Sequence, residues 1–123
     1  MRECGQIQRI SGLWYSAEYA TFSISDEAGN YRLTVAGYSG DAGDAMVGPA
    51  NVNFRADGYM FSTPDRDNDI ASTFNCAAYR LSGWWFGWCT LSDLNLGTMN
   101  GLWKEDIPDT LDVTTSRMML KIV

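Results

Sequence analysis

The sequence contains no histidine, and cysteine and proline occur only three times each. Without histidine, the commonest general base of enzymes is missing, and Cys4 has no activating partner near it in the sequence. Neighbouring carboxylates such as Glu105 and Asp106 could act as an acid and a base, but such pairs are far commoner as surface charges. The composition therefore argues against an enzyme.

Long apolar runs and clusters of basic residues are also missing. No stretch approaches the roughly twenty apolar residues that a transmembrane helix needs, which argues against insertion in a membrane. The start of the chain shows no basic segment followed by an apolar one, so no signal peptide is visible. The net charge of -6 and the pI of about 4.4 argue against nucleic acid as a partner.

What remains is a chain of 123 residues, 46% hydrophobic and 13% aromatic, which is the profile of one packed domain. Residues 13–24 and 31–38 are rich in aromatic and β-branched residues, and the turn-forming "DEAGN" between them predicts two antiparallel strands. The glycine-rich residues 39–51 predict a loop with at most one helical turn. Residues 52–63 predict a hairpin around "ADG", and residues 116–123 predict a strand buried mainly on one face.

Two of the three cysteines, Cys76 and Cys89, flank the aromatic stretch "SGWWFGW" at a separation of thirteen positions. A disulfide between them would close a loop of a size that stabilises the folded state by roughly 3 kcal/mol. Cys4 would then remain without a disulfide partner. Three cysteines without histidine suit a zinc site poorly, so one disulfide and one unpaired thiol are favoured, together with an oxidising compartment. Because no signal peptide is visible, we expect the N-terminus to be incomplete.

The stretch "STPDRDNDI" carries three aspartates at alternate positions, Asp65, Asp67 and Asp69. Such a cluster is costly unless water or a cation neutralises it, so it is either a solvated turn or a metal loop for a hard cation such as calcium. An EF-hand count that starts at Asp65 places Ile70 where that loop needs glycine and Cys76 where it needs glutamate, which excludes the EF-hand. Spacing alone leaves the solvated turn and a different calcium loop open.

The aromatic cluster consists of Trp84, Trp85, Phe86 and Trp88. Aromatic residues this dense usually form core, and core packing is favoured for the cluster taken alone. An exposed row could instead form a platform for sugar rings or acetyl groups. Insertion into a membrane interface would need a basic face, which this segment lacks.

Five blocks occur in a characteristic order: "YRLTVAGYSGDAGDAM", "FSTPDRDND", "NCA", "WWFGWC" and "MMLKIV". In this order they resemble the fibrinogen C-terminal domain family, which includes ficolins, tachylectins, angiopoietins, tenascins and the fibrinogen chains. The resemblance implies an α+β fold, mostly antiparallel β with long irregular loops, that lacks the N-terminal subdomain of the family. It divides the chain into a non-matching N-terminal extension over residues 1–12 and a partial fibrinogen C-terminal domain over residues 13–123.

The resemblance also implies a calcium loop and a disulfide between Cys76 and Cys89. By this likeness Asp67 and Asp69 supply side-chain ligands, and backbone carbonyls near Ala71 and Thr73 complete the shell. Asp65 is expected to act through water or as a supporting charge. These assignments make Ca²⁺ the expected cofactor.

In the lectin-like members of the family, the ligand pocket lies beside the calcium loop, around the second cysteine. The likeness implies a cis peptide bond between Trp88 and Cys89, amides of Cys89 and Thr90 that face an acetyl carbonyl, and aromatic walls from Phe86 and Trp88. The chain departs from the family pattern by Thr90 where a histidine is common, by "SDLNLGTM" for "SNLNGxY", and by a deletion before "NGLW".

The resulting expectation is a secreted, extracellular, calcium-binding recognition module, a ficolin-like lectin for acetylated carbohydrate in innate immunity. One alternative is a protein-binding module of the angiopoietin or tenascin type that contacts cell-surface or matrix proteins. Another is a truncated product without a competent pocket. Oligomers could form through upstream segments, and no enzymatic activity is expected.

Overall fold

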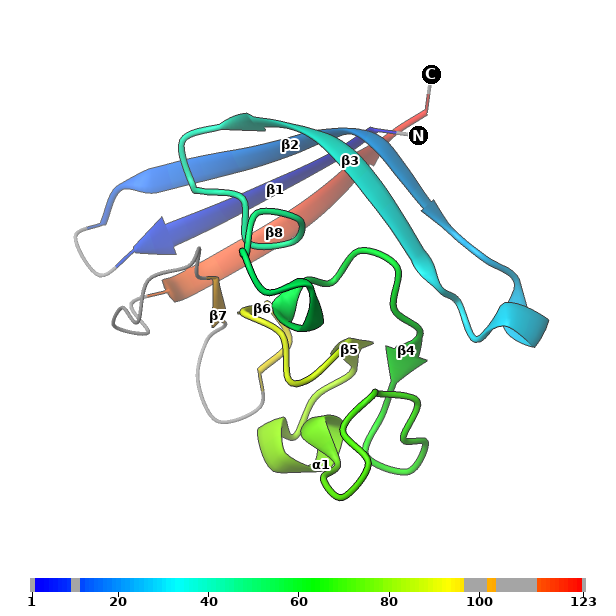
Figure 1. Cartoon of the computed structure of the whole chain (residues 1–123). Helices are drawn as coiled ribbons and strands as arrows, with labels where there is room; N and C mark the ends of the chain where they lie inside the picture. The colour runs from blue at the N-terminus through cyan, green and yellow to red at the C-terminus, as the bar shows by residue number, and fades with distance from the viewer. Residues whose placement is uncertain (1, 10–11, 97–101, 104–112, 123) are drawn as a thin grey trace.

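The computed structural model describes residues 2–9, 12–96, 102–103 and 113–122. Figure 1 shows a long antiparallel sheet on one side and an irregular half, built from short elements and loops, on the other. The sheet has the order β3-β2-β1-β8, with β1 Arg2–Arg9, β2 Trp14–Ile24, β3 Leu33–Gly40 and β8 Val113–Lys121. The expected fold, mostly antiparallel β with long irregular loops, is confirmed.

The predicted pair of strands is confirmed as β2 and β3, which pair from Ile24 opposite Leu33 to Ala17 opposite Gly40. Between them lies the 3-10 helix η1 (Glu27–Gly29), and the side chain of Asp26 caps it by accepting from the amide of Gly29. The strands alternate as a half-buried sheet does, since Leu33 and Val35 are buried while Thr34 is exposed. The local alternation was sufficient to predict this hairpin.

Residues 1–12 were predicted to be an extension outside the domain, and the structure corrects this. Over Arg2–Arg9 they form β1, which pairs with β2 on one side and β8 on the other. Gly5 lies opposite both Ala17 and Met118, and Ile7 is only 2% exposed. A strand that pairs on both sides does not need a clear alternation of apolar and polar residues to form, because both neighbouring strands supply its backbone hydrogen bonds.

The predicted C-terminal strand is confirmed as β8, but its predicted burial is wrong. Met118, Met119 and Leu120 are 38%, 44% and 52% exposed, and Ile122 beyond the strand is 84% exposed. Only the start of the strand is covered, where Val113 is 7% exposed. β8 is an edge strand whose C-terminal half extends away from the irregular half in Figure 1, and its side chains there are largely exposed although β1 pairs with it.

The irregular half contains η2 (Val52–Phe54), β4 (Phe61–Ser62), α1 (Cys76–Arg80), β5 (Trp84–Trp85), β6 (Ser92–Asp93) and β7 (Leu102–Trp103). β4 pairs with β5, and β6 pairs with β7. The predicted hairpin over residues 52–63 is wrong, because Phe61 pairs with Trp85 from a distant part of the sequence. The amide of Val35 donates to the carboxylate of Asp57, which draws the predicted turn onto the edge of β3 instead.

The loop predicted over residues 39–51 is confirmed from Asp41 onward, since Ser39 and Gly40 still belong to β3. One turn of the loop is stabilised by Asp44. Its carboxylate accepts from the hydroxyl of Tyr19 at 2.7 Å and from the amide of Val47 at 3.0 Å. This turn places Met46, which is fully buried, in the core between the sheet and the irregular half.

Three of the four clustered aromatic residues belong to that core, as core packing predicted. Trp84, Trp85 and Phe86 are 1%, 9% and 0% exposed, and Phe22 of the sheet packs edge-on against Trp85. Within the described residues, no helix is long and apolar enough to cross a membrane.

Candidate ligand site at the acidic loop and disulfide

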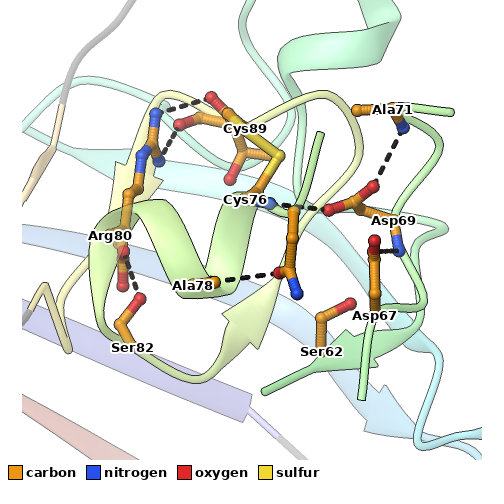
Figure 2. The surroundings of a disulfide bond; sticks show 12 residues. Ser62, Asp67, Asp69, Ala71, Cys76, Ala78, Arg80, Ser82 and Cys89 are labelled. Carbon is orange, nitrogen blue, oxygen red and sulfur yellow. Dashed lines mark hydrogen bonds between the residues drawn. A yellow bond between two sulfur atoms is a disulfide. The ribbon is translucent and has the colours of Figure 1, made fainter. Parts of the chain in front are cut away.

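The candidate site lies where the acidic loop after β4 meets the segment closed by the disulfide (Figure 2). The structure joins Cys76 at the start of α1 to Cys89 after β5, with the two Cα atoms 5.1 Å apart. The disulfide implied by the resemblance is therefore present. It ties the loop segment around Cys89 to the helix that follows the acidic residues.

Asp65 lies at the exposed tip of the acidic loop, where the backbones of Thr63 and Arg66 bridge to each other. The Asp65 carboxylate accepts from the hydroxyl of Thr63 at 2.7 Å. This hydrogen bond lowers the pKa of Asp65, chiefly by stabilising the ionised form. Asp65 is thus satisfied within its own turn.

Asp69 has a different role, because it connects the acidic loop to the disulfide. One carboxylate oxygen accepts from the amide of Ala71 and the other from the amide of Cys76, both at 2.9 Å. The carboxylate of Asp67 accepts from the amide of Asp69 at 3.2 Å (Figure 2). Burial raises the pKa of Asp69, and the nearby Asp67 carboxylate raises it further, against the lowering effect of the amides.

The paired carboxylates of Asp67 and Asp69 fit a hard cation. Calcium binds carboxylate and carbonyl oxygens, and its charge would offset the repulsion between two neighbouring carboxylates. Ala71 is buried and Thr73 is exposed in the backbone that follows. Across the described ranges, no group of three or more acidic, cysteine or histidine side chains could hold a metal, so Asp65 is not gathered with the other two.

The helix α1 carries the contacts that hold the segment after β5. Its N-cap Asn75 accepts from the amide of Ala78 at 3.0 Å and donates to the carbonyl of Pro64 in the acidic loop at 3.2 Å. At the other end, Arg80 donates to the carbonyls of Cys89 at 2.6 Å and Thr90 at 2.5 Å. One short helix therefore links the acidic loop with the second cysteine.

Two of the four predicted ligand-binding residues do not reach the surface. Phe86 is 0% exposed. The guanidinium carbon of Arg80 lies over its ring, 5.6 Å from the ring centroid. Thr90 is also 0% exposed, and its hydroxyl donates to the carbonyl of Ser92. The predicted aromatic wall from Phe86 and the predicted contact from the Thr90 amide are wrong, because both residues are fully enclosed.

The predicted cis bond between Trp88 and Cys89 is also wrong, since the bond is trans. The chain turns at Cys89 through a left-handed backbone conformation with φ of 48°. The amide of Trp88 donates to the carbonyl of Asn53 at 2.7 Å, which holds the approach to this turn. Cys89 is half-buried, and its amide donates to no acceptor within the described residues.

Beside Cys89 lies an aromatic patch, formed by Phe74, Tyr79 and Trp88, that the sequence did not predict as a unit. The rings of Phe74 and Trp88 are stacked at 5.6 Å and 3°, and Tyr79 packs edge-on against Phe74 at 5.2 Å. The three side chains are 38%, 64% and 45% exposed. Their positions in the sequence give no shared period, because the disulfide and α1 bring them together.

A second group missed in the sequence is the buried Asp93, on β6. Its carboxylate accepts from the Ser82 hydroxyl at 2.6 Å and from the Asn95 amide at 3.2 Å. Burial raises the pKa of Asp93 to about 6, despite the lowering effects of Ser82 and the charge of Arg80. A signal was present in "SDLNLGTM", which carries this aspartate at the second position.

Comparison with known families gives one consistent match. A family model described as "Fibrinogen beta and gamma chains, C-terminal globular domain" matches residues 5–107. Fibroleukin from Homo sapiens is 39% identical over 89 residues, which are 72% of this chain and 20% of that protein. A techylectin-like protein from Phoneutria nigriventer is 39% identical over 79 residues, 64% of this chain and 32% of that protein. The chain thus spans about a third or less of these two relatives.

Solved structures agree with these sequence matches. The fibrinogen-like globe domain of human ANGPTL2 superposes with a TM-score of 0.78 and 28% identity, over 95% of this chain and 56% of that one. Lamprey fibrin D-dimer, solved in complex with the peptide ligand Gly-His-Arg-Pro-amide, superposes with a TM-score of 0.71 and 32% identity, over 76% of this chain and 31% of that one.

Proposed function

The chain belongs to the fibrinogen C-terminal domain family, a family of non-enzymatic binding modules, and we propose that its ligand is acetylated carbohydrate, bound next to a calcium loop. The observation that carries this proposal is the surface around Cys89. There an unpaired amide of a half-buried residue lies beside the exposed ring of Trp88. Such an amide can donate to an acetyl carbonyl while the flat ring contacts a methyl group or a sugar face.

The aromatic patch extends this surface. Phe74 and Tyr79 continue from Trp88 as exposed rings, and aromatic faces with a polar rim suit pyranose rings. Phe86 and Thr90 are left out of the proposed contact set because both are enclosed. The proposed ligand surface therefore consists of the Cys89 amide and the aromatic patch.

Calcium is proposed to bind at Asp67 and Asp69. Their paired carboxylates support a divalent cation, with carbonyls near Ala71 and Thr73 and with water as the remaining donors. Asp69 also accepts from the amide of Cys76, so a cation at this position would stabilise the disulfide side of the site. Asp65 contributes only a nearby charge in this proposal.

A second candidate function is recognition of a peptide or protein. The lamprey fibrin D-dimer was solved with a peptide ligand, and an angiopoietin-related protein 6 from Mus musculus is 41% identical over 87 residues. Exposed aromatic residues are also typical of protein-binding surfaces. The techylectin-like relative favours the carbohydrate proposal by its name alone.

We infer that the module works outside the cell. The disulfide between Cys76 and Cys89 supports this location, because disulfides persist in oxidising compartments. Extracellular recognition of acetylated glycans would suit a role in innate immunity. Detection of the native chain in the culture medium of its source cells would test the location directly.

Retention on immobilised N-acetylglucosamine tests the carbohydrate proposal. We expect the folded protein to be retained on the resin in calcium and to be released by a chelator. Trp88→Ala should lower the affinity for the resin at least about tenfold. The matched control is Trp14→Ala, since Trp14 on β2 has the same 45% exposure but lies on the sheet. Failure of the parent protein to bind in calcium would refute the proposal, and binding of Gly-His-Arg-Pro-amide instead would favour peptide recognition.

A further inference from the structure

Arg80 makes the contacts that fix the backbone of the proposed ligand site. Its two terminal nitrogens donate separately to the carbonyls of Cys89 and Thr90, at 2.6 Å and 2.5 Å (Figure 2). A planar guanidinium holds two acceptors in one geometry, which a lysine ammonium cannot reproduce. The orientation of the Cys89–Thr90 peptide is therefore set by a side chain that lies outside the ligand surface.

This orientation decides which way the neighbouring amides point. In a trans peptide the carbonyl and the following amide point in opposite directions, so the Cys89 carbonyl that faces Arg80 turns the Thr90 amide away from it. The amides of Trp88 and Leu91, which flank the turn in the sequence, donate to the carbonyls of Asn53 and Phe54. The turn at Cys89 is thus held between η2 and Arg80.

Arg80 itself sits in a partly desolvated position that disfavours its charge. Burial lowers the pKa of Arg80, and the negative charge of Asp93 acts against this effect. Asp93 accepts hydrogen bonds from the uncharged groups of Ser82 and Asn95. The partner strand β7 contributes Leu102 and Trp103, and neither side chain titrates. Among the described residues, Arg80 is the charged group that acts on Asp93, while Tyr79 acts on Arg80.

We propose that Arg80 is a positioning residue for the ligand site: it holds the backbone of the Cys89 turn in place through the carbonyls of Cys89 and Thr90, without touching the ligand itself. The identity of the ligand in this inference rests on the proposed function.

The test compares two variants with the parent protein, with N-acetylglucosamine resin as the probe and calcium kept in excess. At pH 7.5 we expect Arg80→Lys to lower affinity about tenfold, since one of two charged hydrogen bonds is lost. The control is Arg32→Met, which removes a comparable bond from an arginine to the carbonyl of Gly58 on the sheet side.

Hydrogen exchange of the Trp88 and Leu91 amides gives a readout that needs no ligand. Faster exchange in Arg80→Lys, with Arg32→Met unchanged, supports the positioning role even if the parent protein fails to bind the resin, in which case the proposed function is refuted instead. Unchanged exchange and unchanged affinity in Arg80→Lys would overturn the positioning role.

Discussion

The sheet and the irregular half are stabilised by different kinds of contact. In the sheet, backbone ladders between long strands satisfy the polar groups, and side chains only have to alternate between core and solvent. In the irregular half, α1 has five residues and the strands have two, so side chains take over that task. Asp69, Asn75 and Arg80 each bond backbone groups there.

The difference has a functional consequence. A side chain that holds backbone in place is specific to its position, whereas an exposed strand residue can be exchanged at little cost. We therefore expect polar substitutions near the candidate site to be far more damaging than substitutions on the outer parts of the sheet. Four changes test this comparison, taken from the largest expected effect to the smallest.

Removal of the disulfide should have the largest effect. Replacing Cys76 and Cys89 together by alanine opens a loop with a sequence separation of 13, and we expect a loss of about 3 kcal/mol in the free energy of unfolding. Urea unfolding would measure it, and reduction of the parent protein should give a comparable loss. A loss below about 1 kcal/mol would mean that side-chain hydrogen bonds alone hold the irregular half.

Asp93→Asn tests the buried carboxylate through pH. Burial raises the pKa of Asp93 from its usual 3.8 to about 6, so the folded state binds more protons than the unfolded state between these values. The contribution of Asp93 to stability therefore falls as the pH rises through that window, by at most about 3 kcal/mol. We expect the parent protein to lose stability relative to Asp93→Asn between pH 4 and pH 7, and parallel unfolding profiles would contradict this.

Asp69→Ala removes the acceptor for the amides of Ala71 and Cys76. We expect a loss of about 2 kcal/mol without calcium, since two amides lose a charged acceptor in a half-buried position. Asp65→Ala is the matched control, because that carboxylate is exposed and bonds only the hydroxyl of Thr63. Equal losses in the two variants would show that Asp69 has no special role in connecting the loop to the disulfide.

Calcium sharpens the same experiment. If Asp67 and Asp69 hold the ion, calcium should raise the melting temperature of the parent protein, and both Asp67→Ala and Asp69→Ala should abolish the rise. Asp65→Ala should reduce it less. Equal melting temperatures of the parent protein in calcium and in chelator would refute the metal site.

Leu120→Lys on β8 should have the smallest effect. Leu120 is 52% exposed, so we expect a change within about 0.5 kcal/mol in the free energy of unfolding of this chain. Ile7→Ala on the neighbouring strand is the control, because Ile7 is 2% exposed and its loss should cost at least about 2 kcal/mol. A large loss from Leu120→Lys would show that this part of the strand is covered in solution.

Much of the sheet could be predicted from local sequence. β2 and β3 follow from alternation and a turn between them, since both signals lie within a few residues of each other. β1 was missed because its pairing with β2 and β8 supplies what its own pattern does not. The hairpin predicted over residues 52–63 failed because Phe61 has its partner in β5, more than twenty positions away.

The candidate site was predicted only in part. The acidic triplet and the cysteine pair were visible as residue types, and the resemblance assigned them to a loop and a disulfide. The sequence did not distinguish Phe86 from Trp88, two positions apart, although the first is enclosed and the second is exposed. Arg80 and Asp93 gave no signal as a pair, because thirteen positions and the strand β5 separate them.

By itself, the sequence determined the antiparallel hairpin, the acidic loop, the spacing of the disulfide and the family to which the chain belongs, because each depends on residue type and local order. Tertiary structure alone decided which side chains are covered, and thus that the exposed surface runs through Phe74, Tyr79 and Trp88. It also decided that Arg80 holds Cys89 and that β8 is half uncovered. The physical reason is that burial and charge pairing depend on which distant element packs against a residue, and no local pattern encodes that.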